Sequence, residues 1–131
     1  FLRNLENGAP VKGFTDVFFC PLYVIDMVEY LMQAVEKQLR GLYHLCSVES
    51  LSKYDFGLHI ARVFNLDANL ISPITVSDVD FIQAPRSKNL VLDTGKIEQA
   101  LGRATPSQAE GLARFHHDFQ DGYAMRLQTL V

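Results

Sequence analysis

Apolar residues recur at helical spacing in one long segment, residues 23–40. Each apolar position follows the last by three or four residues, with polar residues between them: Val24, Met27, Val28, Leu31, Val35 and Leu39. This period places the apolar side chains on one side of a helix, and a glycine at position 41 is suited to end it. The pattern predicts a helix from Tyr23 to Arg40 with a broad apolar stripe.

Shorter apolar runs on both sides of this segment predict strands. The run Thr15–Cys20 is short and apolar and stops at a proline, and Leu42–Cys46 is short and rich in aromatic and apolar residues. Residues 70–76 contain Pro73, which has no N–H to donate, so they form an edge strand or an extended loop. We expect the first two of these segments to be strands.

Polar residues suited to helix ends mark the remaining helices. Ser52 precedes Asp55 by three residues, the spacing of a capping box. The pair Asp93–Thr94 and Gly102 bracket a short helix, and Thr105 with the following proline opens the last one. The order is strand, helix, strand, helix, edge strand, loop, helix, helix, which indicates the α/β class.

Length, composition and charge limit the number of domains and the classes of function that the chain can have. At 131 residues, with 48% hydrophobic and 21% charged residues, the chain is predicted to form a single domain over residues 1–131. A net charge of -3 without a basic stripe argues against nucleic acid, and no apolar run is long enough for a membrane. The two cysteines suggest no disulfide framework, so cytoplasmic localisation is expected. Residues 1–5 lack Met and resemble the tail of a helix, so we expect the C-terminal part of a longer polypeptide.

The segment Ala84–Gly102 carries the strongest functional signal. Its loop, Ala84–Asn89, holds Arg86 and Lys88, and a short apolar run and a capped helix follow it. A guanidinium on a loop with packed structure behind it is suited to a doubly charged group such as a phosphate.

Four stretches, in order, resemble the dTDP-4-dehydrorhamnose reductase branch of the extended short-chain dehydrogenases that act on nucleotide-sugars. They are Thr15–Asp26, Gly41–Phe56, Ala84–Lys96 and Ser107–Leu112. The resemblance implies an α/β fold: the small C-terminal substrate lobe, with helices packed on a short sheet and the Rossmann lobe absent from this chain. It covers nearly the whole chain.

Two motifs of that family are absent from the sequence. None of the eight glycines has the GxxGxxG spacing of the dinucleotide fingerprint, and no tyrosine is followed four residues later by lysine. We therefore expect no catalytic and no cofactor-binding residue in this chain. The resemblance implies that the parent enzyme uses NADH or NADPH, held by an N-terminal Rossmann lobe.

The resemblance also implies the substrate-binding residues. Arg86 would reach the diphosphate of the sugar nucleotide, Lys88 would add charge, and Tyr23 would line a base or sugar pocket. The structural alternatives are a solvated arginine, an exposed lysine and a packed aromatic ring. Ser87 stands where the family usually has proline, and Leu22 where it usually has threonine.

Other polar residues favour structural roles. Asp16 and Asp26 could serve as catalytic carboxylates, but a turn cap and a favourable helix-dipole position account for them better. His116 and His117 are adjacent, so on a helix their side chains point about 100° apart and do not share a metal ion. We expect no metal site.

Two functions follow from the resemblance. The first is the nucleotide-sugar-binding lobe of an NAD(P)H-dependent oxidoreductase that reduces a 4-keto-6-deoxysugar nucleotide. The second is a non-catalytic regulatory module, because the same family includes the regulatory subunit of methionine adenosyltransferase. In either case we expect an exposed apolar patch where the N-terminal lobe docks, with a tendency to self-associate into a homo-oligomer.

Overall fold

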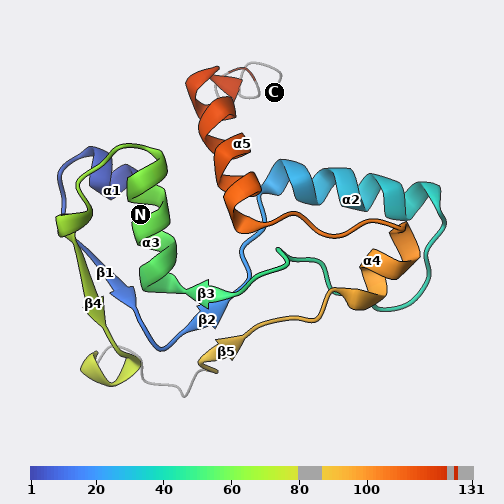
Figure 1. The fold of residues 1–131 in the computed structure, drawn as a ribbon, viewed down its shortest axis with the longest axis horizontal. Helices are drawn as coiled ribbons and strands as arrows, with labels where there is room; N and C mark the ends of the chain where they lie inside the picture. Colours follow the sequence, from blue (N-terminus) through green and yellow to red (C-terminus); the bar gives the residue numbers. More distant parts are fainter. Residues whose placement is uncertain (80–86, 124–125, 127–131) are drawn as a thin grey trace. The chain divides into compact units, whose positions relative to one another are not determined.

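The computed structural model describes residues 1–79, 87–123 and 126 (Figure 1). They form a mixed α/β structure in two compact units. The first unit comprises residues 1–21 and 49–93, and the second comprises residues 22–48 and 94–131. Each unit is described by itself below. The α/β class is confirmed, and the single domain over residues 1–131 stays a prediction.

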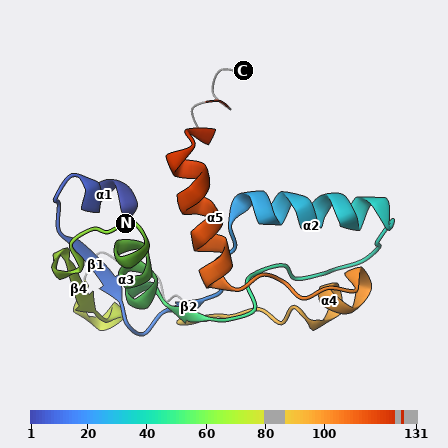
Figure 2. The ribbon, with the colours of Figure 1, turned by 45° about the horizontal axis from the view of Figure 1, so that its top comes forward.

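The first unit is built on a parallel strand pair, β1 (Val11–Phe14) and β4 (Ile71–Ile74). The register pairs Val11 with Ile71. Helix α1 (Leu2–Glu6) precedes the pair, and α3 (Lys53–Val63) packs against both strands (Figure 2). A Cβ atom on Gly13 would lie 2.7 Å from the Cα atom of Tyr54, so β1 approaches α3 at a distance that only glycine permits.

A second, smaller sheet lies in the same unit. It has the order β3-β2-β5, with β2 (Phe18–Phe19) between β3 (Leu51–Ser52) and β5 (Asn89–Leu90). Strand β3 runs antiparallel to β2, and β5 runs parallel to it. Two short 3₁₀ turns, η1 (Ala68–Leu70) and η2 (Val76–Asp78), flank β4. The expectation of helices packed on a short sheet is confirmed.

The predicted strand Thr15–Cys20 is wrong in its extent. The structure has β1 before it and only the two residues of β2 within it. The Asp16 side chain accepts the N–H of Val76 at 3.0 Å, and Thr15 donates to the carbonyl of Ile74, so these residues form a bend instead of continuing a ladder. The segment 70–76, left open between edge strand and loop, contains the strand β4.

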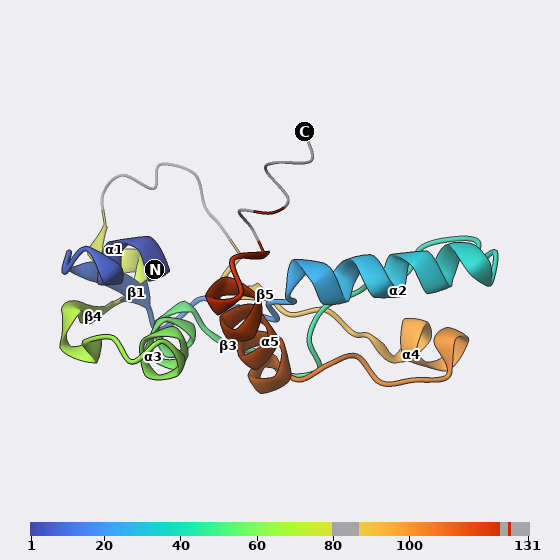
Figure 3. The ribbon, with the colours of Figure 1, turned by 90° about the horizontal axis from the view of Figure 1, so that it is seen from above.

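Among its described residues, the second unit has three helices, α2 (Val24–Glu36), α4 (Gly95–Leu101) and α5 (Gln108–Gln120). Its core is formed by the buried side chains of Tyr30, Ile97 and Leu101. Leu39 and the segment 42–46 pack against this core through partly buried apolar side chains. After α2 the chain turns back and runs in the direction opposite to that helix (Figure 1 and Figure 3).

The long helix is confirmed, but its predicted end is wrong. Helix α2 ends at Glu36, and Gln38 adopts a left-handed conformation with φ of 52°. The Lys37 ammonium donates to the carbonyls of Ala100 and Leu101 at the end of α4, at 3.3 and 3.1 Å. These hydrogen bonds from Lys37 hold the chain in a turn directly after Glu36, so the helix ends before the predicted Arg40. Gly41 lies beyond this turn.

The apolar stripe of α2 is largely exposed. Its four outermost side chains are between about half and three quarters exposed: Val24, Val28, Leu31 and Val35. The buried residues of this helix are instead Asp26 and Tyr30, which lie between the apolar positions. An amphipathic helix ordinarily packs its apolar face against a core. The apolar face of α2 departs from this, because the described residues leave it exposed.

Two further predictions need correction. Residues 42–46 are not a strand, because within the described part of the chain no neighbouring strand pairs with them. The last helix is capped by Ser107 with Glu110, and Thr105 instead bonds to Glu98. The Ser52 cap and the left-handed Gly102 at the end of α4 are confirmed.

Candidate functional site

The three predicted substrate-binding residues fall in different parts of the chain. Tyr23 is the N-cap residue of α2 in the second unit, and Lys88 immediately precedes β5 in the first. Arg86 lies outside the described residues. The roles of all three in binding substrate stay predictions.

Tyr23 is a half-buried phenol with a specific partner on α5. Its hydroxyl donates to a carboxylate oxygen of Asp118 at 2.9 Å. Its ring lies 5.7 Å, centroid to centroid, from the ring of Phe115, which in turn contacts Phe119. Burial, reinforced by the hydrogen bond and negative charge of Asp118, raises the pKa of Tyr23 to about 12. Tyr23 is therefore a neutral donor at neutral pH, and its oxygen keeps a lone pair that can accept from a ligand hydroxyl.

We expect the Asp118→Asn variant to lower the pKa of Tyr23, without returning it fully to its usual 10. The neutral amide removes the contribution of Asp118, but the larger effect of burial remains. A pH titration of the tyrosine ring signals by NMR measures this shift. His117→Gln is the matched control, because it changes the neighbouring surface residue and leaves Asp118 in place. An unchanged Tyr23 titration in Asp118→Asn would contradict this assignment.

Lys88 is paired in the first unit. Its ammonium lies 2.6 Å from a carboxylate oxygen of Asp16, and its side chain is more than half exposed. The hydrogen bond from Lys88 lowers the pKa of Asp16, which also accepts the N–H of Val76. Asp16 therefore has the structural role that its position favours. An ammonium has three donors, so this ion pair leaves Lys88 able to contact an anion as well.

Asp26 is the center of a charged cluster in the second unit. One of its carboxylate oxygens accepts from Arg114 of α5, and the same guanidinium bonds to Glu29 at 2.8 Å. The other oxygen is buried and has no partner among the described residues. Burial raises the pKa of Asp26, with Arg114 opposing it, whereas the bond from Arg114 lowers the pKa of Glu29.

The pairing of Asp26 with Arg114 was missed by sequence reasoning. The one signal in the sequence is a carboxylate placed between apolar helix positions. If such a carboxylate is buried, a cation must pair with it. The partner lies 88 residues further along the chain, and no local pattern identifies it. The structural role favoured for Asp26 is consistent with this ion pair.

A shallow pocket of about 600 Å³ opens beside this cluster. It is lined by residues of both charges, including Asp26, Arg103, Glu110 and Arg114. The guanidinium of Arg103 lies over the ring of Tyr30, 3.9 Å from its centroid. Opposite charges alternate within this lining, so it offers no continuous anion-binding or cation-binding surface.

No group of three or more metal-ligating side chains occurs in the described ranges. The Nδ1 atom of His117 lies 3.4 Å from Asp118 and 3.7 Å from Asp121, on the surface of α5. Within residues 1–79, 87–123 and 126, no helix combines the length and apolar character of a membrane span.

Known proteins with similar sequences cover the same region. The family model described as the RmlD substrate binding domain matches residues 1–121. The "Probable low-salt glycan biosynthesis reductase Agl14" of Haloferax volcanii is 28% identical over 118 residues, which are 90% of this chain and 39% of that protein. The methionine adenosyltransferase 2 subunit beta of Rattus norvegicus is 36% identical over 92 residues, or 66% of this chain and 27% of that protein.

Solved structures share the fold. The dTDP-4-dehydrorhamnose reductase of Bacillus anthracis, in complex with NADP, superposes with a TM-score of 0.78 at 24% identity, over 88% of this chain and 41% of that one. The orthologous reductase of Clostridium acetobutylicum gives 0.79 at 21% identity, over 91% and 42%. The chain thus spans about two fifths of these enzymes.

The match over residues 1–121 and the shared fold agree with the four sequence stretches that suggested this family. The expected fold is confirmed, because the chain superposes on part of each of these reductases. The chain belongs to the RmlD substrate binding domain family.

Proposed function

We propose that this chain is the nucleotide-sugar-binding lobe of an NAD(P)H-dependent reductase that acts on a 4-keto-6-deoxysugar nucleotide, as in rhamnose biosynthesis. The observation that carries the proposal is the match of the substrate-binding family over residues 1–121 of 131. The fold supports it, because the superposed solved structures include dTDP-4-dehydrorhamnose reductases.

Three residues bind the substrate in this proposal. Arg86 contacts the diphosphate, and Lys88 supplies a second positive charge close to it in the sequence. Tyr23 accepts a hydrogen bond from a sugar or base hydroxyl while its own hydroxyl donates to Asp118, as the 2.9 Å contact allows. Contacts of this kind orient a substrate, which is how a binding lobe assists a reaction carried out on another lobe.

The reaction itself needs groups beyond this chain. An NADH or NADPH nicotinamide, bound by an N-terminal Rossmann lobe, supplies hydride for the C4 carbonyl of the sugar, and a tyrosine of that lobe supplies the proton. This chain has neither the dinucleotide fingerprint nor the Tyr-x-x-x-Lys pair. Its residues bind and orient the substrate.

The test is turnover by the longer protein that carries this chain. Incubated with a dTDP-linked 4-keto-6-deoxysugar, the protein should oxidise NADPH or NADH and yield the 4-hydroxy sugar nucleotide, identified by mass spectrometry. A protein that neither binds nor reduces dTDP-, UDP- or GDP-linked keto sugars would overturn the proposal. Binding without turnover would support the proposed role in binding the sugar nucleotide and contradict the proposed reductase activity.

A second function is favoured by one specific observation. The segment of 92 residues that matches methionine adenosyltransferase 2 subunit beta of the rat is 36% identical, against 28% for the longer match to the archaeal reductase. The alternative is a non-catalytic regulatory module that binds a partner enzyme. An intact GxxGxxG and Tyr-x-x-x-Lys upstream of Phe1 would favour the reductase, and loss of the latter would favour the module.

A further inference from the structure

The pocket of about 600 Å³ in the second unit contains charged groups of both signs that are not paired with each other. Residues of α2, of α5 and of the segment 103–106 line it, and two carboxylates and two guanidiniums are among them: Asp26, Glu110, Arg103 and Arg114. Arg114 is already paired with Asp26 and Glu29. Among the described residues, the lining groups without an ion-pair partner are the guanidinium of Arg103 and the carboxylate of Glu110.

The guanidinium of Arg103 is positioned by stacking and not by hydrogen bonds. It lies over the ring of Tyr30, 3.9 Å from its centroid. Tyr30 is buried, and its hydroxyl donates to the carbonyl of Ala104, so the ring is fixed. The Arg103 side chain donates to no other described residue, and a stacked guanidinium keeps its N–H groups available at its edges. Arg103 therefore presents the planar pair of donors that suits a carboxylate.

The second unpaired group is Glu110, in the first turn of α5. One of its carboxylate oxygens accepts both the N–H and the hydroxyl of Ser107 at 2.7 Å, in the cap of this helix. These two bonds hold the carboxylate in one orientation. Its other oxygen accepts from no described residue, so it can accept from an ammonium group.

The buried carboxylate of Asp26 adds an acceptor to the same lining. Its Oδ2 atom is buried and has no partner among the described residues. Burial is the largest cause of the raised pKa of Asp26, and among the smaller effects Arg103 lowers this pKa and Glu110 raises it. The two unpaired charges are thus close enough to Asp26 to act on the same carboxyl. Native proteins rarely leave a buried acceptor unpaired, so this oxygen favours a ligand that carries a donor.

We propose that this pocket binds a small zwitterion of the α-amino acid class, whose carboxylate pairs with Arg103 and whose ammonium pairs with Glu110, beside Asp26. The two unpaired groups have opposite charges, so a simple anion or a simple cation is attracted by one of them and repelled by the other. A ligand with a carboxylate and an ammonium on neighbouring carbon atoms satisfies both groups and leaves no net charge in the site.

The size and the remaining lining of the pocket suit a ligand of this class. Its volume is within the range of small-molecule sites. Three small apolar residues lie in the lining beside the charged groups and can contact a short aliphatic side chain: Ala104, Pro106 and Ala113. The pocket is lined by none of the proposed substrate-binding residues, so the inference does not depend on sugar-nucleotide binding.

NMR titration of the longer protein with glycine and with L-leucine tests the inference. The signals of Arg103 and Glu110 should shift saturably with a dissociation constant of about 1 mM, because two charge-assisted contacts replace contacts with water. Acetate and methylammonium each carry one of the two charges and should bind at least about tenfold more weakly. Equal affinity for acetate and glycine, or no saturable shift with either amino acid, would overturn the inference.

Two variants assign the two charges. Arg103→Ala should weaken glycine binding by about tenfold or more, because the ligand's carboxylate loses its partner. Glu110→Gln should weaken glycine binding similarly without weakening that of acetate. Glutamine also serves at this position of a capping box, so this variant removes the charge and keeps the helix cap. Unchanged glycine affinity in either variant would contradict the assignment.

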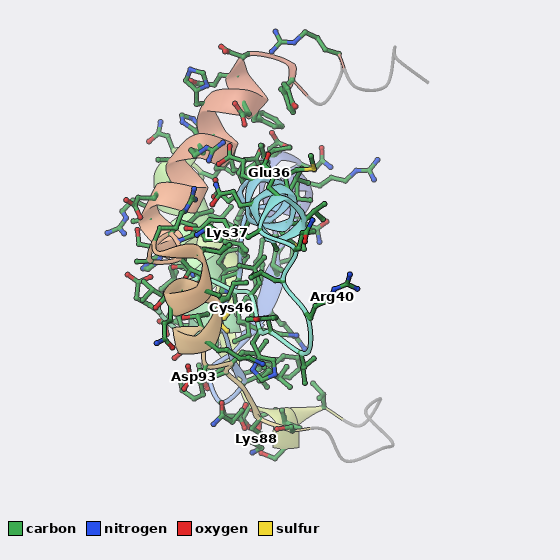
Figure 4. The ribbon with its side chains drawn as sticks, turned by 90° about the vertical axis from the view of Figure 1, so that its right-hand side faces the viewer. Glu36, Lys37, Arg40, Cys46, Lys88 and Asp93 are labelled. Atoms are coloured by element: carbon green, nitrogen blue, oxygen red, sulfur yellow. The ribbon has the colours of Figure 1, made fainter. Side chains whose placement is uncertain are left out.

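Arg40→Ala is the matched control for Arg103→Ala. Arg40 is an exposed arginine of the same unit that does not line this pocket, and Figure 4 shows its side chain projecting away from the ribbon. Glycine affinity should be unchanged in this variant. An equal loss of affinity in Arg40→Ala and Arg103→Ala would show a general dependence on net charge and would reject the pocket. Unchanged circular dichroism spectra show that the variants are folded.

Discussion

Arg86→Ala in the longer protein should weaken nucleotide-sugar binding by about thirty- to a thousandfold. Losing one charge-assisted contact to a diphosphate at a partly desolvated site costs on the order of 2–4 kcal/mol. Arg86→Lys should recover only part of the affinity, because an ammonium keeps the charge but loses the planar fork that binds two oxygens. Calorimetric titration with the sugar nucleotide measures both variants.

Two controls accompany the Arg86 variants. Nicotinamide affinity should hardly change, because in the proposed function that cofactor is bound by the other lobe. The free energy of unfolding should change far less than the binding free energy, because in the proposed function Arg86 acts on the substrate. Lys88→Ala is the matched loop variant: Lys88 is already paired with Asp16, so we expect its loss to weaken binding less than that of Arg86. Unchanged affinity in Arg86→Ala would remove Arg86 from the site.

Arg114→Ala should lower the free energy of unfolding by about 2–4 kcal/mol at neutral pH. The Asp26 side chain is only 3% exposed, and Arg114 is its cationic partner. Removing one partner leaves a buried carboxylate uncompensated, which costs more than the ion pair itself contributes. Chemical denaturation followed by circular dichroism measures the change.

The loss in Arg114→Ala should depend on pH in a defined direction. Burial already raises the pKa of Asp26 above 3.8, and removal of Arg114 removes the largest effect that opposes it, ahead of that of Arg103. A carboxyl whose folded pKa is raised contributes stability that is fully present below its unfolded pKa and is lost as pH rises through the folded value. The difference between wild type and variant should therefore be largest at neutral pH and shrink as the pH falls toward 3.8.

Glu29→Ala is the control for this cluster. Glu29 also bonds to Arg114, but its side chain is 45% exposed, so its removal should cost no more than about 1 kcal/mol. Asp26→Asn combined with Arg114→Ala should restore part of the stability, because the neutral amide needs no cation. A cost in Arg114→Ala equal to that in Glu29→Ala would show that burial of Asp26 does not determine the stability of this pair.

Local sequence determined where the helices lie and how several of them begin and end. The apolar period placed α2, the Ser52 cap placed α3, and Gly102 ended α4. These signals suffice because a helix satisfies its backbone groups within its own segment, and its caps lie a few residues away. The family could likewise be inferred from four short stretches, because each resembles a stretch of the family and the four occur in the same order.

Tertiary contacts decided the strands. Val11–Phe14 carries a glycine and a lysine and has no strong strand pattern, yet it pairs with Ile71–Ile74 far along the chain. Leu42–Cys46 has the opposite character, a strong strand pattern that joins no sheet in the described structure. A strand exists only where a neighbour accepts and donates its backbone hydrogen bonds, and a single segment carries no information about that neighbour.

The direction in which helix α2 faces was also decided by the tertiary structure. Its period indicates an apolar side but not what covers it, and the unit buries Asp26 and Tyr30 instead. For the candidate site, too, some properties follow from the sequence and others from the tertiary structure. Residue type and motif position alone point to Tyr23, but its raised pKa comes from burial and from Asp118, 95 residues away. Sequence determined which groups are present, and only long-range packing decided their partners, because solvation and charge depend on the residues that folding brings close.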